Sequence, residues 1–142
     1  LKRMAMKLST NSLVVSVDYP IDATPKNLNP VGSLKKSCKL ISNKGHRVEL
    51  FLADSHSLAT IKKVKELGPF DFGFIDGDHS YEGVKKDWEN YGPMCKTVGF
   101  HDIGGPVEGC TRFWRELKEQ GIYSTKEFIN PKRALGIGIV FR

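Results

Sequence analysis

Long apolar runs are missing from this sequence: no stretch approaches the ~20 residues that a membrane-spanning helix needs. Residues 1–8 are short and basic, without the apolar core of a secretory signal. Cysteine is scarce, and the absence of a CxxC pair predicts reduced thiols in a cytoplasmic protein, with no catalytic role for Cys38, Cys95 or Cys110. Internal repeats and low-complexity linkers are also absent, so residues 1–142 are predicted to form a single domain.

The charge is unbalanced, with 22 lysines and arginines against 16 aspartates and glutamates and a formal net charge of +6. The lysines fall mainly on predicted helices, opposite the apolar positions, which is typical of a solvated face. A nucleic-acid surface usually adds interleaved aromatic residues or a known binding module, and the sequence shows neither. Neither a nucleic acid nor a membrane is therefore an expected partner.

Strand-like and helix-like patterns alternate along the chain. Apolar, β-branched runs predict strands, and apolar residues at helical spacing predict the helices between them. Alternation at this spacing favours an α/β fold with a mainly parallel sheet and helices on both faces. The last two strands are close enough to form an antiparallel hairpin. The predicted strands are 12–18, 47–53, 70–75, 97–101, 123–129 and 135–141, with a turn at 130–133, and the predicted helices begin near residues 30, 56, 80 and 107, after a helical pattern in residues 1–8.

Some of these elements carry a prediction of burial. The strand Phe70–Ile75 is expected to be a buried parallel strand that runs into an acidic, histidine-bearing loop. Helical spacing places Leu58 on the buried side of its helix, and it places Trp88 and Trp114 in the core.

Acidic residues follow four of the predicted strands at the point where each strand ends. Ligands of open parallel sheets bind outside these carboxyl ends. One such acid commonly caps the next helix, which would be a sufficient explanation for Asp54 or Asp78 alone. Four consecutive strands that each end in an acid favour a shared site. The residues are Asp18, Asp54-Ser55, Asp76-Gly77-Asp78-His79 and His101-Asp102.

Two of these strand ends have the chemistry of an adenosine site. The carboxylate of Asp18 can accept hydrogen bonds from both hydroxyls of a ribose. Asp54 and Ser55, one strand over, can accept from an adenine amino group. The pattern predicts an adenosine-bearing cofactor that lies across the sheet edge.

Three segments then carry a specific resemblance: FIDGDHSYEGVKKDWENYGPM at residues 74–94, GFHDI at 99–103 and FWREL at 113–117. From about Leu13 to the C-terminus, the chain resembles the class I S-adenosylmethionine-dependent methyltransferases. It is most similar to the small-molecule O-methyltransferase branch, with its macrolide sugar methyltransferases and cephalosporin hydroxylase-like proteins. The resemblance implies a Rossmann-like fold, S-adenosylmethionine as cofactor, and a sugar or natural-product hydroxyl as methyl acceptor.

The resemblance also implies roles for residues in the cofactor site. Asp18 matches the acid that holds the cofactor ribose, and Tyr19 matches the side chain that packs on adenine. Asp54, with Ser55 beside it, matches the contact to the adenine amino group. Asp76 ends the next strand of the site and is counted with the cofactor-binding residues.

A divalent metal, Mg²⁺ or Mn²⁺, is the second cofactor that the resemblance implies. Asp76, His101 and Asp102 match the metal ligands, and His79 matches the general base. His101 stands where relatives have an acid, and imidazole suits zinc, iron or manganese better than magnesium. A bound cation would lower the pKa of a substrate hydroxyl, and a nearby histidine would remove the proton. His46 shows no partner pattern and is predicted at the surface, as is His56.

The family fold normally begins with a strand and a GxGxG loop, and no such segment precedes Leu13. We therefore expect a domain truncated at its N-terminus, with the first strand and the Gly-rich loop missing. Three hypotheses stay open: an O-methyltransferase or its C-terminal part, an inactive methyltransferase-like remnant, and a metal-dependent oxygenase or hydrolase. The last would use His79, His101 and either Asp76 or Asp102. A second copy of the chain that completes the sheet is a further expected partner.

Overall fold

The computed structural model describes residues 8–9, 11–19, 30–105, 108–130 and 135–142. The chain divides into two compact units, Leu1–Thr60 and Ile61–Arg142, and each is described by itself. The single-domain organisation of residues 1–142 stays a prediction. The helical pattern of residues 1–8 and the turn at 130–133 fall almost wholly outside the described residues.

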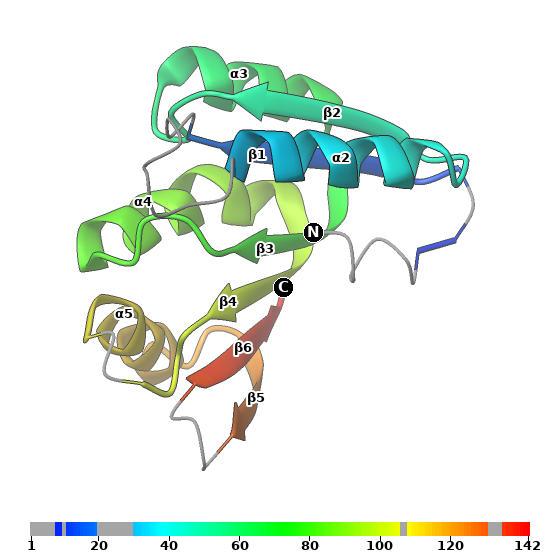
Figure 1. Ribbon diagram of the computed structural model, residues 1–142. Coiled ribbons are helices and arrows are strands. Elements are labelled where there is room, and N and C mark those ends of the chain that lie inside the picture. The colour runs from blue at the N-terminus through cyan, green and yellow to red at the C-terminus, as the bar shows by residue number, and fades with distance from the viewer. Residues whose placement is uncertain (1–7, 10, 20–29, 106–107, 131–134) are drawn as a thin grey trace. The chain divides into compact units, whose positions relative to one another are not determined.

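The first unit contains a two-stranded parallel sheet (Figure 1). Strands β1 (Leu13–Asp18) and β2 (Arg47–Leu52) are connected through helix α2 (Pro30–Ser42), as predicted. Val14 and Ile41 form the buried centre of this unit. Asp18 pairs with Leu52 across the sheet, so the acidic ends of both strands lie at one edge.

The second unit contains a four-stranded mixed sheet in the order β3-β4-β6-β5. Strand β3 is parallel to β4, and β6 is antiparallel to both β4 and β5. This confirms the predicted α/β fold with parallel strands and a C-terminal antiparallel hairpin. The elements are β3 (Phe70–Ile75), α4 (Tyr81–Tyr91), η1 (Gly92–Met94), β4 (Cys95–His101), α5 (Glu108–Glu119), β5 (Ser124–Asn130) and β6 (Leu135–Phe141), and helix α3 (Leu58–Leu67) spans the boundary between the units.

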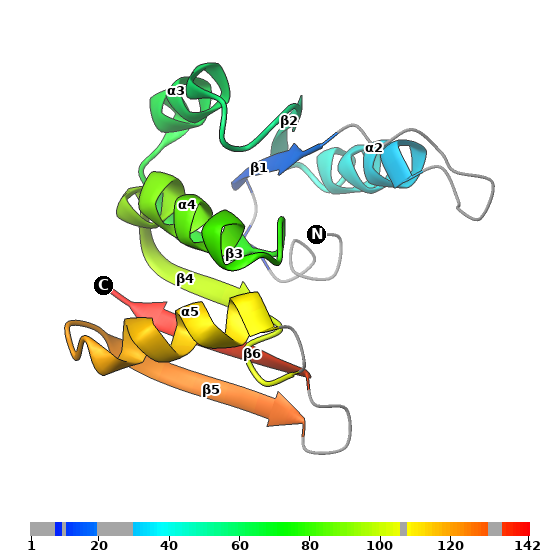
Figure 2. The ribbon, with the colours of Figure 1, turned by 90° about the vertical axis from the view of Figure 1, so that its left-hand side faces the viewer.

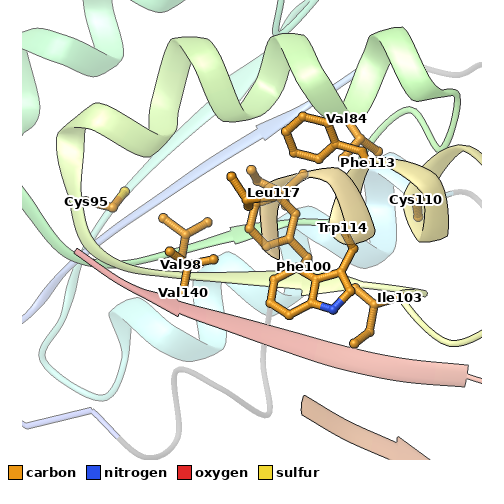
Figure 3. Packing of buried hydrophobic residues seen from close by; sticks show 11 residues of the cluster. Val84, Cys95, Val98, Phe100, Ile103, Cys110, Phe113, Trp114, Leu117 and Val140 are labelled. Atoms are coloured by element: carbon orange, nitrogen blue, oxygen red, sulfur yellow. The ribbon is translucent and has the colours of Figure 1, made fainter. Parts of the chain in front are cut away.

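Helices α4 and α5 lie side by side on one face of this sheet (Figure 2). The main core fills the space beneath them, where Phe100 of β4 meets Trp114 of α5 (Figure 3). The Trp114 ring also lies against β6, where a Cβ on Gly138 would come within 2.6 Å of the indole. Trp88 packs against the same cluster, so both tryptophans are core residues as predicted.

Two predictions of burial are wrong. Strand β3 is parallel to β4, but it ends the sheet order and exposes Asp71 and Phe72, with only Ile75 buried. An apolar run predicts a strand, but it does not reveal whether that strand is central or at an edge. Leu58 is 84% exposed because it opens α3, where helical spacing alone does not show which residues the fold covers.

None of the helices in the described part of the chain has the length and apolar character needed to cross a membrane.

Candidate functional site

The carboxyl ends of β3 and β4 bring four predicted site residues together. Ile75 pairs with Phe100, so the residues that follow these two positions, Asp76 and His101, are neighbours at one edge of the sheet. Figure 1 shows both strands ending on the same side. We call Asp76, His79, His101 and Asp102 the His–Asp cluster.

The atoms of the His–Asp cluster are within contact distance of one another. Asp76 Oδ1 lies 3.3 Å from Nε2 of His79 and 3.0 Å from Nδ1 of His101. On the other side, Asp102 Oδ2 lies 3.4 Å from Nδ1 of His79, and its Oδ1 lies 3.1 Å from Nδ1 of His101. Each histidine ring therefore faces both carboxylates.

Asp102 is the buried member of the cluster. It is 7% exposed, whereas the side chains of Asp76, His79 and His101 are between one-third and one-half exposed. The backbone of Asp102 has φ of +55°, a left-handed conformation that aspartate adopts more readily than most residues. The chain turns at this residue directly after β4, and the turn brings the Asp102 carboxylate against both rings.

The loop that carries His79 is stabilised by the start of α4. Ser80 is the N-cap, and its hydroxyl accepts a hydrogen bond from the Gly83 N–H at 3.0 Å. Asp78 accepts from both the backbone N–H of Ser80 at 2.9 Å and its hydroxyl at 3.0 Å. Gly83 leaves room for the Asp78 carboxyl group, which a Cβ would overlap. Ser80, and not Asp78, is therefore the cap of α4, while Asp78 holds Ser80 in place. The DGDHSYEG stretch is a loop-and-cap motif that presents His79.

The first turn of α5 holds the same loop from the other side. Gly109 approaches the His79 carbonyl so closely that a Cβ would collide with it. The Cys110 thiol donates to that carbonyl oxygen at 3.8 Å. Gly109 could not be predicted as part of the site, because no local pattern shows a contact between residues 30 positions apart.

The cluster lies in a strongly acidic environment. The pKa of Cys110 is raised to about 11, first by burial and then by the negative charges of Asp102, Asp76 and Asp78, in that order of importance. The Cys110 thiol therefore stays protonated at neutral pH, in agreement with a structural role. A concentration of negative charge that disfavours a thiolate favours a cation.

Two buried atoms of the cluster lack hydrogen-bond partners. These are His101 Nδ1 and Asp102 Oδ1, although they lie only 3.1 Å apart. Buried polar groups are normally paired, so such a pair calls for an explanation. Together with the Asp76 carboxylate and the second imidazole, these donors fit a divalent cation, and the metal itself stays a prediction.

The predicted adenosine-binding residues lie in the first unit. Asp18 ends β1, and its carbonyl accepts from the Ala53 N–H at 2.9 Å, so Asp54 follows at the same sheet edge. Asp54 Oδ1 also accepts from the backbone N–H of His56 at 2.8 Å, in the turn before α3, whereas the first turn of α3 is held by Ser57, whose hydroxyl accepts from the Thr60 N–H at 3.3 Å. Tyr19 is 64% exposed. Ser55 is partly buried, and the cofactor roles of all four residues stay predictions.

His46 corrects another prediction, because it is buried and only 8% exposed. A single polar residue ahead of a strand carries no signal for the face on which it lies. His56 is partly buried.

A hollow of about 250 Å³ adjoins the cluster on the side of the hairpin. Its walls are mostly apolar. The lining residues are His101, Phe128, Asn130, Leu135, Gly136 and Ile137.

The sequence pattern of the methyltransferase-domain family matches residues 4–103, well over half of the chain. The chain belongs to this family. The matched segment runs through β1, β2, β3 and β4 and includes the whole His–Asp cluster. The predicted resemblance to methyltransferases is therefore confirmed.

The fold of this methyltransferase is similar to that of a crystal structure of a putative caffeoyl-CoA O-methyltransferase from Staphylococcus aureus. The TM-score is 0.59, the sequence identity is 12%, and the match covers 99% of this chain and 78% of that chain. At this identity the likeness shows the fold alone, which confirms the predicted Rossmann-like class. No protein of curated function matches the chain.

Proposed function

We propose that this methyltransferase transfers a methyl group from S-adenosylmethionine to a hydroxyl of a small molecule, assisted by a divalent cation. Membership of the family supports a methyl donor of this kind. The observation that carries the choice of a hydroxyl acceptor is the His–Asp cluster at the ends of β3 and β4, because it has the groups needed to remove a hydroxyl proton.

The acceptor hydroxyl must lose its proton to become a good nucleophile. A cation held by the cluster would lower the pKa of the acceptor hydroxyl. Asp76, His101 and Asp102 are the predicted ligands, and the donor atoms of all three meet within the cluster. A histidine within reach can then take the proton. His79 is the predicted base, and its Nε2 is the nitrogen directed away from Asp102.

The methyl donor needs a different kind of assistance from the acceptor hydroxyl. A sulfonium leaves as a neutral thioether, so its departure requires alignment with the acceptor rather than an acid. In this proposal Asp18 accepts from the cofactor ribose, Asp54 and Ser55 accept from the adenine amino group, and Tyr19 packs on the adenine ring. The position of Asp18 and Asp54 at one sheet edge supports this assignment.

The hollow beside His101 supports a small acceptor with an apolar part. Its volume of about 250 Å³ is slightly below the roughly 300 Å³ at which drug-sized sites begin, so the acceptor would be small. Phe128 and Ile137 would contact the apolar part, and the acceptor hydroxyl would point toward His101.

Binding of S-adenosylhomocysteine, the product of methyl transfer, tests the proposal directly. Isothermal titration of the full chain is expected to show one site. Asp18→Asn should weaken binding by about tenfold or more, because a charged acceptor for the ribose is lost. Asp71→Asn is the matched control: Asp71 is an exposed strand acid paired with Lys96, and its variant should bind as the unmodified chain does. Absence of any binding heat would disprove the cofactor assignment for this chain.

One alternative function has a specific observation behind it. Asp76, His79 and His101 together offer the two histidines and one carboxylate of a non-haem iron centre. An oxygenase would retain iron through purification and would bind no S-adenosylhomocysteine. Family membership favours the methyltransferase, and the same titration separates the two.

A further inference from the structure

Three ligand atoms in the second unit converge on one point. Asp76 Oδ1, His79 Nε2 and the Nδ1 of His101 all lie within 4.8 Å of one another. They come from the end of β3, the loop before α4 and the end of β4. Each of these side chains is more than one-third exposed, although the His101 Nδ1 atom itself is buried.

Asp102 provides an independent observation. Its buried Oδ1 and the buried His101 Nδ1 lack hydrogen-bond partners. Its other oxygen, Oδ2, lies 3.4 Å from the Nδ1 of His79. Histidines that bind metals commonly present their second nitrogen to a carboxylate, which fixes the ring orientation. Asp102 stands in that relation to His79 and leaves Nε2 for a metal ion.

Contacts to the backbone hold the ligand residues in place before any ion binds. The His79 loop is held by the Ser80 cap on one side and by Gly109 and Cys110 on the other. The left-handed backbone of Asp102 orients the buried carboxylate. Ligands held in this way lose little conformational freedom when an ion binds.

We propose that Asp76, His79 and His101 bind a first-row transition-metal ion such as Zn²⁺, with Asp102 as the residue that positions the His79 ring. This inference deepens the proposed function and rests on it for the role of the ion in methyl transfer. Two imidazole nitrogens and one carboxylate oxygen suit zinc, cobalt, iron or manganese, whereas Mg²⁺ prefers oxygen ligands alone. The His79 Nε2 atom cannot bind the ion and accept the substrate proton at once. In this inference His79 is a ligand, which replaces the role of base that the proposed function gives it, and Asp102 becomes a positioning residue instead of a ligand.

Metal binding by the full chain tests the proposal without any assay of activity. The chain is first freed of metal with a chelator and then titrated separately with Zn²⁺, Co²⁺ and Mg²⁺. We expect one equivalent of Zn²⁺ and of Co²⁺ to bind, and Mg²⁺ to bind at least about tenfold more weakly. Equal or tighter binding of Mg²⁺ would overturn the assignment of the metal class.

The ligand role of His79 is tested with His79→Gln. Loss of a ligand should weaken Co²⁺ binding by about 10- to 100-fold or more and change the visible spectrum of the bound ion. His56→Gln is the matched control, because it removes a histidine from the other unit and should leave both measurements unchanged. Unchanged Co²⁺ affinity and spectrum in His79→Gln would show that His79 is not a ligand.

A measurement on the unmodified chain covers the case in which a variant does not fold. Proton NMR of the Co²⁺-bound chain should show strongly shifted ring signals from two histidines. Signals from one histidine would contradict the proposal. Titration with S-adenosylhomocysteine separates the two levels of inference: metal binding without cofactor binding overturns the proposed function alone, and cofactor binding without metal binding overturns the metal site alone.

Discussion

Asp102 illustrates how much a single residue can decide in this protein. Its position after β4 was visible as an acid at a strand end, and the resemblance to methyltransferases implied a metal ligand there. The structure adds that it is buried, has a left-handed backbone and faces both histidines of the cluster. These properties arise from the turn at the end of β4, so no residue pattern in the sequence predicts them.

Cys110 leads to a prediction about pH. Its pKa rises from 9.0 to about 11 in the folded chain, mainly through burial. Between these values the unfolded chain loses the thiol proton and the folded chain keeps it, so stability must fall as pH rises. Below pH 9 this contribution is fully present, and by about pH 11 it should be lost, with a total of about 3 kcal/mol. Urea unfolding between pH 9 and about pH 11 measures how steeply the free energy of unfolding falls with pH.

The decrease of the free energy of unfolding with rising pH should be less steep in Cys110→Ala. Other groups also titrate at high pH, so the comparison between variants isolates the thiol. Val98→Ala is the control, because it weakens the same core without removing a titrating group and should retain the slope of the unmodified chain. An unchanged slope in Cys110→Ala would contradict the assignment.

At the scale of elements, most positions follow from local patterns. Strand β3 has its predicted limits and helix α4 begins within a residue of its predicted start, because apolar periodicity and the Gly-Pro breaks are local signals. The pairing of β6 between β4 and β5 was not predictable in the same way. Either strand of a hairpin can pair with the neighbouring strand of the sheet. Here β6 pairs with β4, and in this arrangement the Trp114 ring packs closely on Gly138.

The cap of α4 gives a prediction at this scale. Ser80→Ala removes the acceptor for the Gly83 N–H and should lower the free energy of unfolding by about 1 kcal/mol. Ser80→Thr keeps a hydroxyl and should restore most of the loss. Ser124→Ala, at an exposed position of β5, should change stability by less than about 0.5 kcal/mol. Equal stability of Ser80→Ala and the unmodified chain in urea would show that the cap contributes little.

At the scale of the whole molecule, two predictions from the sequence remain to be measured. The single-domain organisation implies that both units unfold together. Strand β3 has one neighbouring strand among the described residues, so a second copy that completes the sheet could pair with its other side. Sedimentation equilibrium measures this association, and a monomer at all accessible concentrations would exclude it.

Phe100→Ala tests the single-domain organisation. Phe100 is 2% exposed and lies 5.6 Å from both Trp88 and Trp114 between ring centroids, so its truncation should cost about 3–5 kcal/mol. Phe72→Ala is the control, because Phe72 is 47% exposed and should cost much less. In a single domain, backbone hydrogen exchange in β1 and β2 should accelerate together with exchange in β4. Acceleration confined to the second unit would show that the two units unfold independently.

The sequence by itself determined the order of the elements, the α/β class, the family and the identity of the candidate site residues, because these depend on local periodicity, turn chemistry and motif. Only the tertiary structure decided that Asp76, His79, His101 and Asp102 meet, which of them is buried, and that β3 lies at the end of its sheet. Those outcomes depend on contacts between residues far apart along the chain. Their geometry is set by how β3, β4 and α5 pack, and no short stretch of sequence contains that information.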